Sequence, residues 1–193
     1  MSCPERAAIR AATLASLEAS GWPAPEVVLD DQDGPPSMHR CNLTWRRTIE
    51  RAGQARSDFV LLCEDDVIFG RWFSENLLSW PVLRELPGNG AFYGSLYNHG
   101  RGALRRESER HSVAKPEFAW GAQALVMTPR TARFLVANWE KKFVNADVRM
   151  PQLAAFLSPI YHHVPSLVDH VGRSLWGGDA HRAVDFDPNW RAL

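Results

Sequence analysis

Apolar positions near the start of the chain recur with the three- and four-residue spacing of an amphipathic helix. Within residues 4–20 this face is formed by Ile9, Ala12, Leu14 and Leu17. A proline stands in the first turn, and Gly21 follows directly after the last residue of the pattern. Proline at the start and glycine just past the end are typical helix boundaries, so a helix is predicted over residues 4–20.

A different pattern occupies residues 58–69. Five apolar residues, 59–63, show no alternation and run directly into Glu64, Asp65 and Asp66. An unbroken run of mostly branched and aromatic residues is typical of a strand covered on both faces, as in a parallel sheet flanked by helices. The pattern therefore predicts a buried strand that ends in concentrated negative charge.

The rest of the chain alternates between short apolar runs and helical patterns separated by turn residues. Further strands are predicted at residues 25–29, 91–97, 120–127 and 161–164, and further helices at 42–52, 72–78, 80–85, 129–139 and 150–157. Residues 98–112 and 165–193 are expected to be irregular. This alternation predicts an α/β fold with a mostly parallel sheet. With no repeat and no linker, residues 1–193 are expected to form a single domain.

Composition narrows the class of protein. A length of 193 residues suits one domain with a real core. The 22 basic and 22 acidic residues balance, which argues against broad electrostatic binding of nucleic acid or an anionic membrane. No apolar run approaches the roughly 20 residues of a transmembrane helix, and no signal-peptide core stands at the start. Three widely spaced cysteines favour reduced thiols, so a cytoplasmic enzyme is expected.

The three adjacent carboxylates are the first candidate for chemistry. Glu64, Asp65 and Asp66 repel one another unless a cation or a set of hydrogen-bond donors compensates. Carboxylate oxygens are the ligands that hard divalent cations prefer, so the triplet indicates a metal site. The alternative is that one carboxylate forms a turn while the others face water.

The second half of such a site is expected in the tail. His170 belongs to a polar pair with Asp169 inside an otherwise apolar segment, and Gly172 follows two residues later. His162 and His163 lie in a predicted strand, where one is expected to point inward and the other outward in structural roles. His170 is therefore the histidine predicted to have a functional role.

Four segments together carry a resemblance to a known family. They are the strand ending Glu-Asp-Asp at residues 64–66, Trp-Gly-Ala-Gln-Ala-Leu at 120–125, Ala-Asp-Val at 146–148, and Pro-Ser-Leu-Val-Asp-His-Val-Gly at 165–172. In this order they resemble the nucleotide-sugar-dependent glycosyltransferases of GT-A fold. The chain is most similar to small bacterial enzymes and to the family that adds sugars to lipooligosaccharide, and residues 4–22 are similar to their opening helix.

The resemblance implies a GT-A-like (Rossmann-like) three-layer sandwich with a mostly parallel central sheet. It implies metal-dependent, inverting transfer of a sugar from a nucleoside-diphosphate sugar, expected to be a UDP-sugar, to an acceptor hydroxyl. Asp66 matches the carboxylate that binds Mn²⁺ or Mg²⁺, and His170 matches the histidine that completes the metal shell. Glu64 and Asp65 are then expected nearer the nucleotide, with glutamate where the family usually has aspartate.

Other positions take roles from the same resemblance. Asp147 matches the carboxylate that faces the acceptor hydroxyl and would act as the base; it also suits a helix cap. Gly121 matches a small loop beside the donor sugar. Trp120 is expected either to stack on a sugar ring or to pack in the core. Asp30 or Asp31 is expected to contact the nucleobase and ribose, with plain turn formation as the alternative.

Two loops carry further expectations. The arginines of residues 98–112 are expected to form a solvated surface, with phosphate binding as the alternative; they are Arg101, Arg105, Arg106 and Arg110. In the tail, Trp176, Gly177 and Gly178 are expected to close over a bound donor.

The main departure from the family lies at the start, where only residues 1–3 precede Pro4. Three explanations are open: a first strand reduced to a stub, a trimmed chain, or a second chain that completes the sheet as a homodimer. Two other functions also remain open, a non-catalytic nucleotide-sugar or carbohydrate-binding module and a metal-dependent phosphohydrolase.

Overall fold

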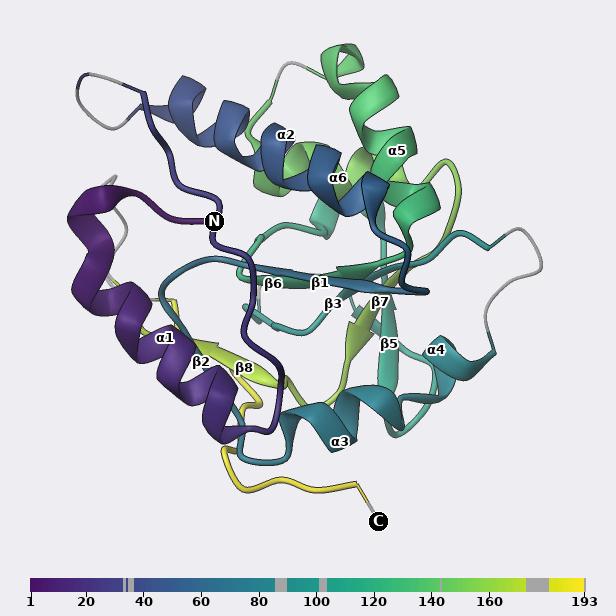
Figure 1. Cartoon of the computed structure of the whole chain (residues 1–193). Helices are drawn as coiled ribbons and strands as arrows, with labels where there is room; N and C mark the ends of the chain where they lie inside the picture. Colours follow the sequence, from purple (N-terminus) through teal and green to yellow (C-terminus); the bar gives the residue numbers. More distant parts are fainter. Residues whose placement is uncertain are drawn as a thin grey trace.

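A computed structural model describes residues 1–32, 34, 37–85, 90–100, 104–142, 144–172 and 181–192. Helices and strands are mixed along the chain, as expected of an α/β fold (Figure 1). The helices are α1 (Ala7–Ala19), α2 (Met38–Gln54), α3 (Phe73–Leu78), α4 (Pro81–Arg84), α5 (Pro129–Ala137) and α6 (Ala146–Ala154), with 3₁₀ turns η1 (Pro4–Arg6), η2 (Pro116–Phe118) and η3 (Trp139–Lys141). The strands are β1 (Val60–Cys63), β2 (Val67–Phe69), β3 (Tyr93–Ser95), β4 (Leu104–Arg106), β5 (His111–Ala114), β6 (Ala124–Met127), β7 (Ile160–His163) and β8 (Val168–His170).

The main sheet has six strands in the order β1-β6-β3-β7-β5-β4. Only β3 and β7 pair in parallel among the described strands, and the other four pairs are antiparallel. The expectation of a mostly parallel sheet is therefore wrong. Parallel neighbours need a long crossover, usually a helix, but between β3 and β6 the described chain forms the β4–β5 hairpin and one 3₁₀ turn. Strand β6 consequently runs antiparallel between β1 and β3, which share a direction.

The sheet is buried on both faces, and β6 shows this most clearly. All four of its residues are buried. Leu125 and Met127 belong to a core cluster with α2, α5 and α6, whereas Ala124 and Val126 belong to a second cluster with α1, α3 and α4. Figure 1 shows α2, α5 and α6 on one side of the sheet and α3 on the other. Burial on both faces explains why the strands lack polar alternation, whatever their direction.

Helix α2 supplies one wall of the cavity described below, and its N-cap and apolar face explain why these residues form a helix at this place. Ser37 is its N-cap, and its hydroxyl accepts a hydrogen bond from the backbone N–H of Arg40 at 3.2 Å. Trp45 and Ile49, one turn apart, are buried against the sheet and α5. This apolar face fixes the helix, so that its first turns lie beside the end of β1.

Two strand pairs were absent from the sequence prediction. Strand β4 and the start of β5 lie in residues 98–112, which were expected to be a loop. Strands β2 and β8 form a separate antiparallel pair, in which Val67 is opposite His170 and Phe69 is opposite Val168. Each strand of the second pair has only three residues, too few for a pattern, and its partner is about a hundred residues away. This pairing carries His170 to the acidic triplet.

The strand expected at residues 25–29 is reduced to one parallel bridge between Ser2 and Leu29. The N–H of Ser2 donates to the carbonyl of Val28 at 3.0 Å, and the amino group of Met1 donates to the carbonyl of Cys63 at 2.8 Å. Residues 1–2 therefore connect this segment to the end of β1.

The expectation that one of His162 and His163 points inward and the other outward is wrong. They lie on opposite faces of β7, and both are buried, at 2% and 0% exposure. The outward position is missing because β7 is an interior strand of a sheet covered on both sides.

Among the described residues, no helix is long and apolar enough to cross a membrane.

Candidate active site

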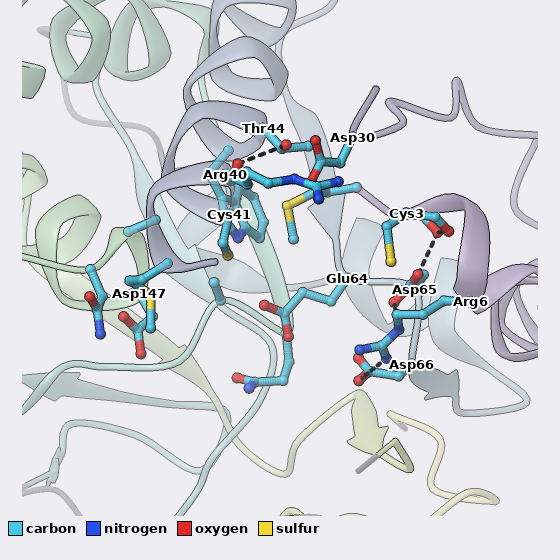
Figure 2. Close-up of a pocket in the computed structure, with 18 of the residues that line it drawn as sticks. Cys3, Arg6, Asp30, Arg40, Cys41, Thr44, Glu64, Asp65, Asp66 and Asp147 are labelled. Atoms are coloured by element: carbon cyan, nitrogen blue, oxygen red, sulfur yellow. Dashed lines mark hydrogen bonds and ion pairs between the residues drawn. The ribbon is translucent and has the colours of Figure 1, made fainter. Parts of the chain in front are cut away.

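A cavity of about 380 Å³ opens where the end of β1 meets the first turns of α2 and α6 (Figure 2). Segments from both ends of the chain line it: residues 1–3 and Arg6 near the start, and His170 and His181 near the end. Five of the predicted acidic residues lie in its wall; they are Asp30, Glu64, Asp65, Asp66 and Asp147. The fold thus brings together carboxylates that are up to 117 positions apart in the sequence (147 − 30).

A compact group within this wall could hold a metal ion. One ligand atom each from Glu64, Asp66 and His170 lie within 4.8 Å of one another. The first two follow β1, and His170 ends β8, with its Nε2 3.0 Å from Oδ2 of Asp66. Oδ1 of Asp66 is buried without a hydrogen-bond partner among the described residues. Two carboxylates, one of which keeps an unused buried oxygen, and one imidazole fit a divalent cation of the Mg²⁺ or Mn²⁺ class.

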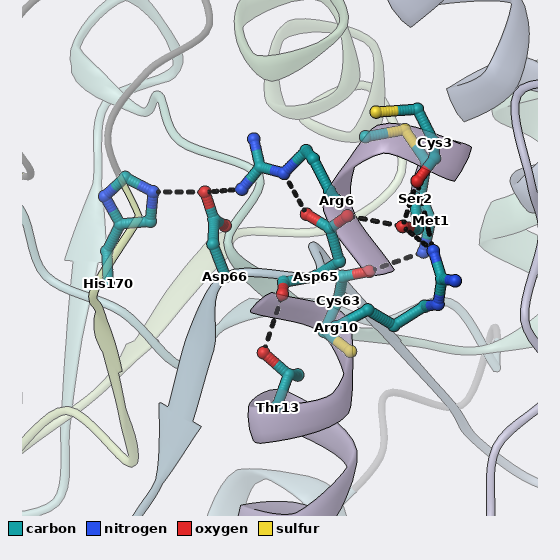
Figure 3. A network of polar contacts seen from close by, with 10 residues as sticks. All are labelled: Met1, Ser2, Cys3, Arg6, Arg10, Thr13, Cys63, Asp65, Asp66 and His170. Carbon is teal, nitrogen blue, oxygen red and sulfur yellow. Dashed lines mark hydrogen bonds and ion pairs between the residues drawn. The ribbon is translucent and has the colours of Figure 1, made fainter. Parts of the chain in front are cut away.

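Arg6 was not predicted in the site. It belongs to η1, and its Nη2 donates to Oδ2 of Asp66 while its Nε lies 2.9 Å from Oδ1 of Asp65 (Figure 3). The Asp65 carboxylate also accepts from the hydroxyl of Ser2, and its carbonyl accepts from Thr13 at 2.8 Å. Asp65 is therefore anchored to the N-terminal segment and lies outside the three-residue metal group. The sequence signal for Arg6 was only its place in a helix-opening Pro-Glu-Arg.

The pKa values of the three members of the metal group are shifted from their ordinary values by different causes. Burial, followed by the charge of Asp66, raises the pKa of Glu64 to about 8. Burial also acts to raise the pKa of Asp66, but the hydrogen bond from His170 and the ion pair with Arg6 outweigh it and lower that pKa. For His170, burial lowers the pKa and the contact with Asp66 more than restores it, so the net shift is upward. Asp66 is thus the firmly ionised carboxylate of the group.

Asp147 lies in the first turn of α6, in the wall of the same cavity. In Figure 2, Glu64 lies between Asp147 and Asp66. Burial raises the pKa of Asp147, which favours proton uptake at this position. The N-cap residue of α6, Asn145, makes no side-chain cap bond. Instead, Oδ1 of Asn42 on α2 accepts a hydrogen bond from the N–H of Ala146 at 2.7 Å, so another helix holds the first turn of α6.

Asp30 and Asp31 occupy different environments. Asp30 is buried in the cavity wall, with Oδ2 2.9 Å from Nε of Arg40. Asp31 is 66% exposed and pairs with Arg47 at 2.5 Å, outside the cavity lining. Of the two, Asp30 is placed where it can meet a ligand in the cavity.

Trp120 and Gly121 lie beside the cavity and not in its lining, which Ala122 and Gln123 supply instead. Trp120 is 37% exposed, and its ring centroid lies 4.7 Å from that of His99. Gly121 has a φ of +97°, and a Cβ there would lie 2.5 Å from Oε1 of Gln123. Gly121 therefore shapes the turn that presents Gln123.

Arg105, Arg106 and Arg110 lie away from the cavity lining. Arg105 is 81% exposed beside Glu107, and Arg106 bonds carbonyls of its own hairpin turn. Arg110 donates to the carbonyl of Ser79 at 2.9 Å and lies over the ring of Trp190. The predictions for Arg101, Trp176, Gly177 and Gly178 fall outside the described residues.

No known protein-family model matches the sequence, and a search of curated proteins gives no significant match. Any function must therefore be argued from the residues of the cavity and their chemistry.

Proposed function

We propose that this protein is a metal-dependent glycosyltransferase that moves a sugar from a nucleoside-diphosphate sugar, a UDP-sugar, to an acceptor hydroxyl. The observation that carries the proposal is the convergence of Glu64, Asp66 and His170 in one cavity that Asp147 also lines. A phosphohydrolase or a binding module would need only Glu64, Asp66 and His170, and would have no use for Asp147 as a base. The proposed fold is a GT-A-like layered variant in which β6 enters antiparallel between β1 and β3.

Glu64, Asp66 and His170 are the residues that would hold Mn²⁺ or Mg²⁺. A bound divalent cation supplies Lewis acidity that stabilises a departing diphosphate. Asp66 anchors the group because it is ionised and keeps one buried oxygen unpaired. Glu64, whose pKa is raised to about 8, gains its ligand form by losing its proton, and His170 would bind the metal through a neutral ring nitrogen.

Asp147 is the proposed general base. Its carboxylate takes the proton of the acceptor hydroxyl while the hydroxyl oxygen bonds to the anomeric carbon and the bond to the diphosphate breaks. A single base opposite the leaving group gives inversion at that carbon. The raised pKa of Asp147 brings its basicity closer to the working pH.

Asp30 is the proposed contact to the nucleoside. It is buried in the cavity wall, and Arg40 holds one of its oxygens, so the carboxylate is fixed in position. A fixed carboxylate can accept hydrogen bonds from ribose hydroxyls or a base N–H.

The test begins with binding. A thermal-shift screen of nucleoside diphosphates and nucleotide sugars is run with and without Mn²⁺, and UDP is expected to raise the melting temperature only when metal is present. Asp66→Asn should abolish this shift. Asp31→Asn, an exposed aspartate outside the cavity, is the matched control and should keep it.

Turnover then separates the functions. The transferase hydrolyses or transfers the donor sugar with Mn²⁺ and releases nucleoside diphosphate. Binding without turnover on any acceptor would instead identify a binding module. Release of inorganic phosphate from simple phosphate esters would identify a phosphohydrolase and overturn the proposal.

A further inference from the structure

Arg6 has an arrangement that the metal group alone does not explain. Its side chain is only 12% exposed and lies in the cavity wall. Nη2 donates to Asp66 and Nε lies 2.9 Å from Asp65 without completing a hydrogen bond, whereas Nη1 makes no recorded contact among the described residues. Figure 3 shows Nη1 pointing away from both carboxylates. An arginine held by two of its nitrogens presents the third in a fixed direction to a ligand.

The charges of the cavity indicate what that ligand is. Arg6 and Arg40 are the two arginines of the described lining, against five carboxylates. Arg40 is paired with Asp30, so Arg6 is the one arginine of the described lining that contacts the triplet. A free Nη1 next to a cation site suits an anion that also binds the cation, and phosphate oxygens are such an anion.

Building on the proposed function, we propose that Arg6 binds the diphosphate of the donor and makes metal binding and diphosphate binding depend on each other. Without a nucleotide, the guanidinium neutralises Asp66 and repels an incoming cation. A diphosphate beside Nη1 offsets both positive charges, so each ligand strengthens the binding of the other.

Arg10 offers a matched control. It lies one turn of chain further on, and its Nη1 donates to the hydroxyl of Ser2 at 2.6 Å and to the carbonyl of Cys3 at 3.1 Å. Arg10 is not itself a lining residue and has no contact with Asp66 among the described residues, although Ser2 and Cys3 belong to the lining. Removing its charge tests general electrostatics without removing the proposed contact.

The experiment is a binding cycle by calorimetry with Mn²⁺ alone, UDP alone and each in the presence of the other, for the wild type, Arg6→Gln, Arg6→Lys and Arg10→Gln. For Arg6→Gln, Mn²⁺ alone should bind several-fold more tightly, because a repelling charge is gone. UDP with Mn²⁺ should bind about tenfold more weakly, and the coupling between the ligands should fall by a similar factor. Arg6→Lys should keep the charge effect on Mn²⁺ but lose most of the UDP affinity, and Arg10→Gln should match the wild type.

In Arg6→Gln, tighter Mn²⁺ binding together with weaker UDP binding would indicate a lost ligand contact, because a purely structural role of Arg6 would weaken the binding of both. If Arg6→Gln weakens both ligands together, or leaves UDP affinity unchanged, the inference is overturned while the proposed function stands. If the wild type binds neither Mn²⁺ nor UDP, the proposed function fails and this inference fails with it. Should Arg6→Gln not fold, Arg6→Lys decides: weaker UDP binding with unchanged Mn²⁺ affinity supports the inference, and unchanged UDP affinity overturns it.

Discussion

Gly172 lies directly against the carboxylate of Asp66. The N–H of Val171 donates to the carbonyl of Asp66 at 2.9 Å, which draws the two segments together. A Cβ on residue 172 would stand 2.5 Å from Cβ of Asp66, closer than real side chains approach. The glycine is therefore required by contact with the proposed metal ligand, and any side chain there must displace Asp66.

Gly172→Ala is accordingly expected to weaken Mn²⁺ binding at least about tenfold and to cost about 1–3 kcal/mol in the free energy of unfolding, as overpacking does. Calorimetry with Mn²⁺ and urea unfolding measure the two effects. Gly70→Ala is the control, since a Cβ there meets its nearest atoms at 3.5–3.7 Å, and it should bind Mn²⁺ normally. Normal Mn²⁺ affinity in Gly172→Ala would contradict the placement of Asp66.

A second single-residue substitution, Asp147→Asn, tests the proposed general base. It removes the proton acceptor and keeps the shape of the side chain, so UDP and Mn²⁺ affinity should stay within about twofold while kcat falls about 10²–10⁴-fold. Steady-state kinetics and the binding cycle provide the measurements. A variant that transfers sugar at an unchanged rate would show that another group takes the proton.

At the scale of elements, α6 depends on α2 for its start. The N-cap residue of α6 makes no side-chain cap bond, and Asn42, 104 residues earlier, accepts the hydrogen bond of the Ala146 N–H instead. Because Asp147 is the next residue, this contact between helices sets where the proposed base lies. A local cap could not couple the base to the wall of the cavity in this way.

Asn42→Ala should therefore destabilise the protein by about 0.5–2 kcal/mol, the range for a lost cap, and also lower kcat without a matching change in donor KM. Thr128→Ala removes the N-cap of α5, whose hydroxyl accepts from the N–H of Thr131, and Thr128 lies outside the cavity lining. It should cost comparable stability with kcat unchanged. If both variants alter kcat equally, Asn42 has no special role in positioning Asp147.

At the scale of the whole molecule, the sheet is covered on both faces, and the side chains of His162 and His163 on β7 are buried as a result. Burial, with His99 contributing, lowers the pKa of His162 to about 4, and burial, with Arg110 and His111 contributing, lowers that of His163 to about 3. Both rings are therefore neutral in the folded protein near neutral pH. The unfolded chain takes up these protons below its ordinary pKa of about 6.5.

These two histidines should consequently make stability fall as the pH is lowered from about 6.5 towards 4, by up to about 1.4 kcal/mol per pH unit for each, whereas the raised pKa of Glu64 acts in the opposite direction over part of this range. Urea unfolding at a series of pH values measures the slope. His162→Gln should reduce the slope by about one histidine's share, whatever it does to stability at pH 7. His39→Gln, at an exposed position on α2, is measured alongside as the matched variant.

Local patterns in the sequence determined much of this protein. The α/β class, the helices at residues 4–20 and 129–139, the strand before Glu64 and the charge at its end follow from spacing, caps and apolar runs, which act over a few residues. The direction of the strands did not follow, because a strand buried on both faces has the same composition whether its neighbours are parallel or antiparallel.

Only the tertiary structure decided the composition of the site. Arg6 reaches Asp66 across 60 positions, and the β2–β8 pairing brings His170 to the same carboxylate across 104. The same packing separates Asp30, in the cavity, from Asp31, on the surface, although the two are adjacent and chemically identical. Contacts between distant segments depend on how whole elements pack, and no short stretch of sequence carries that information.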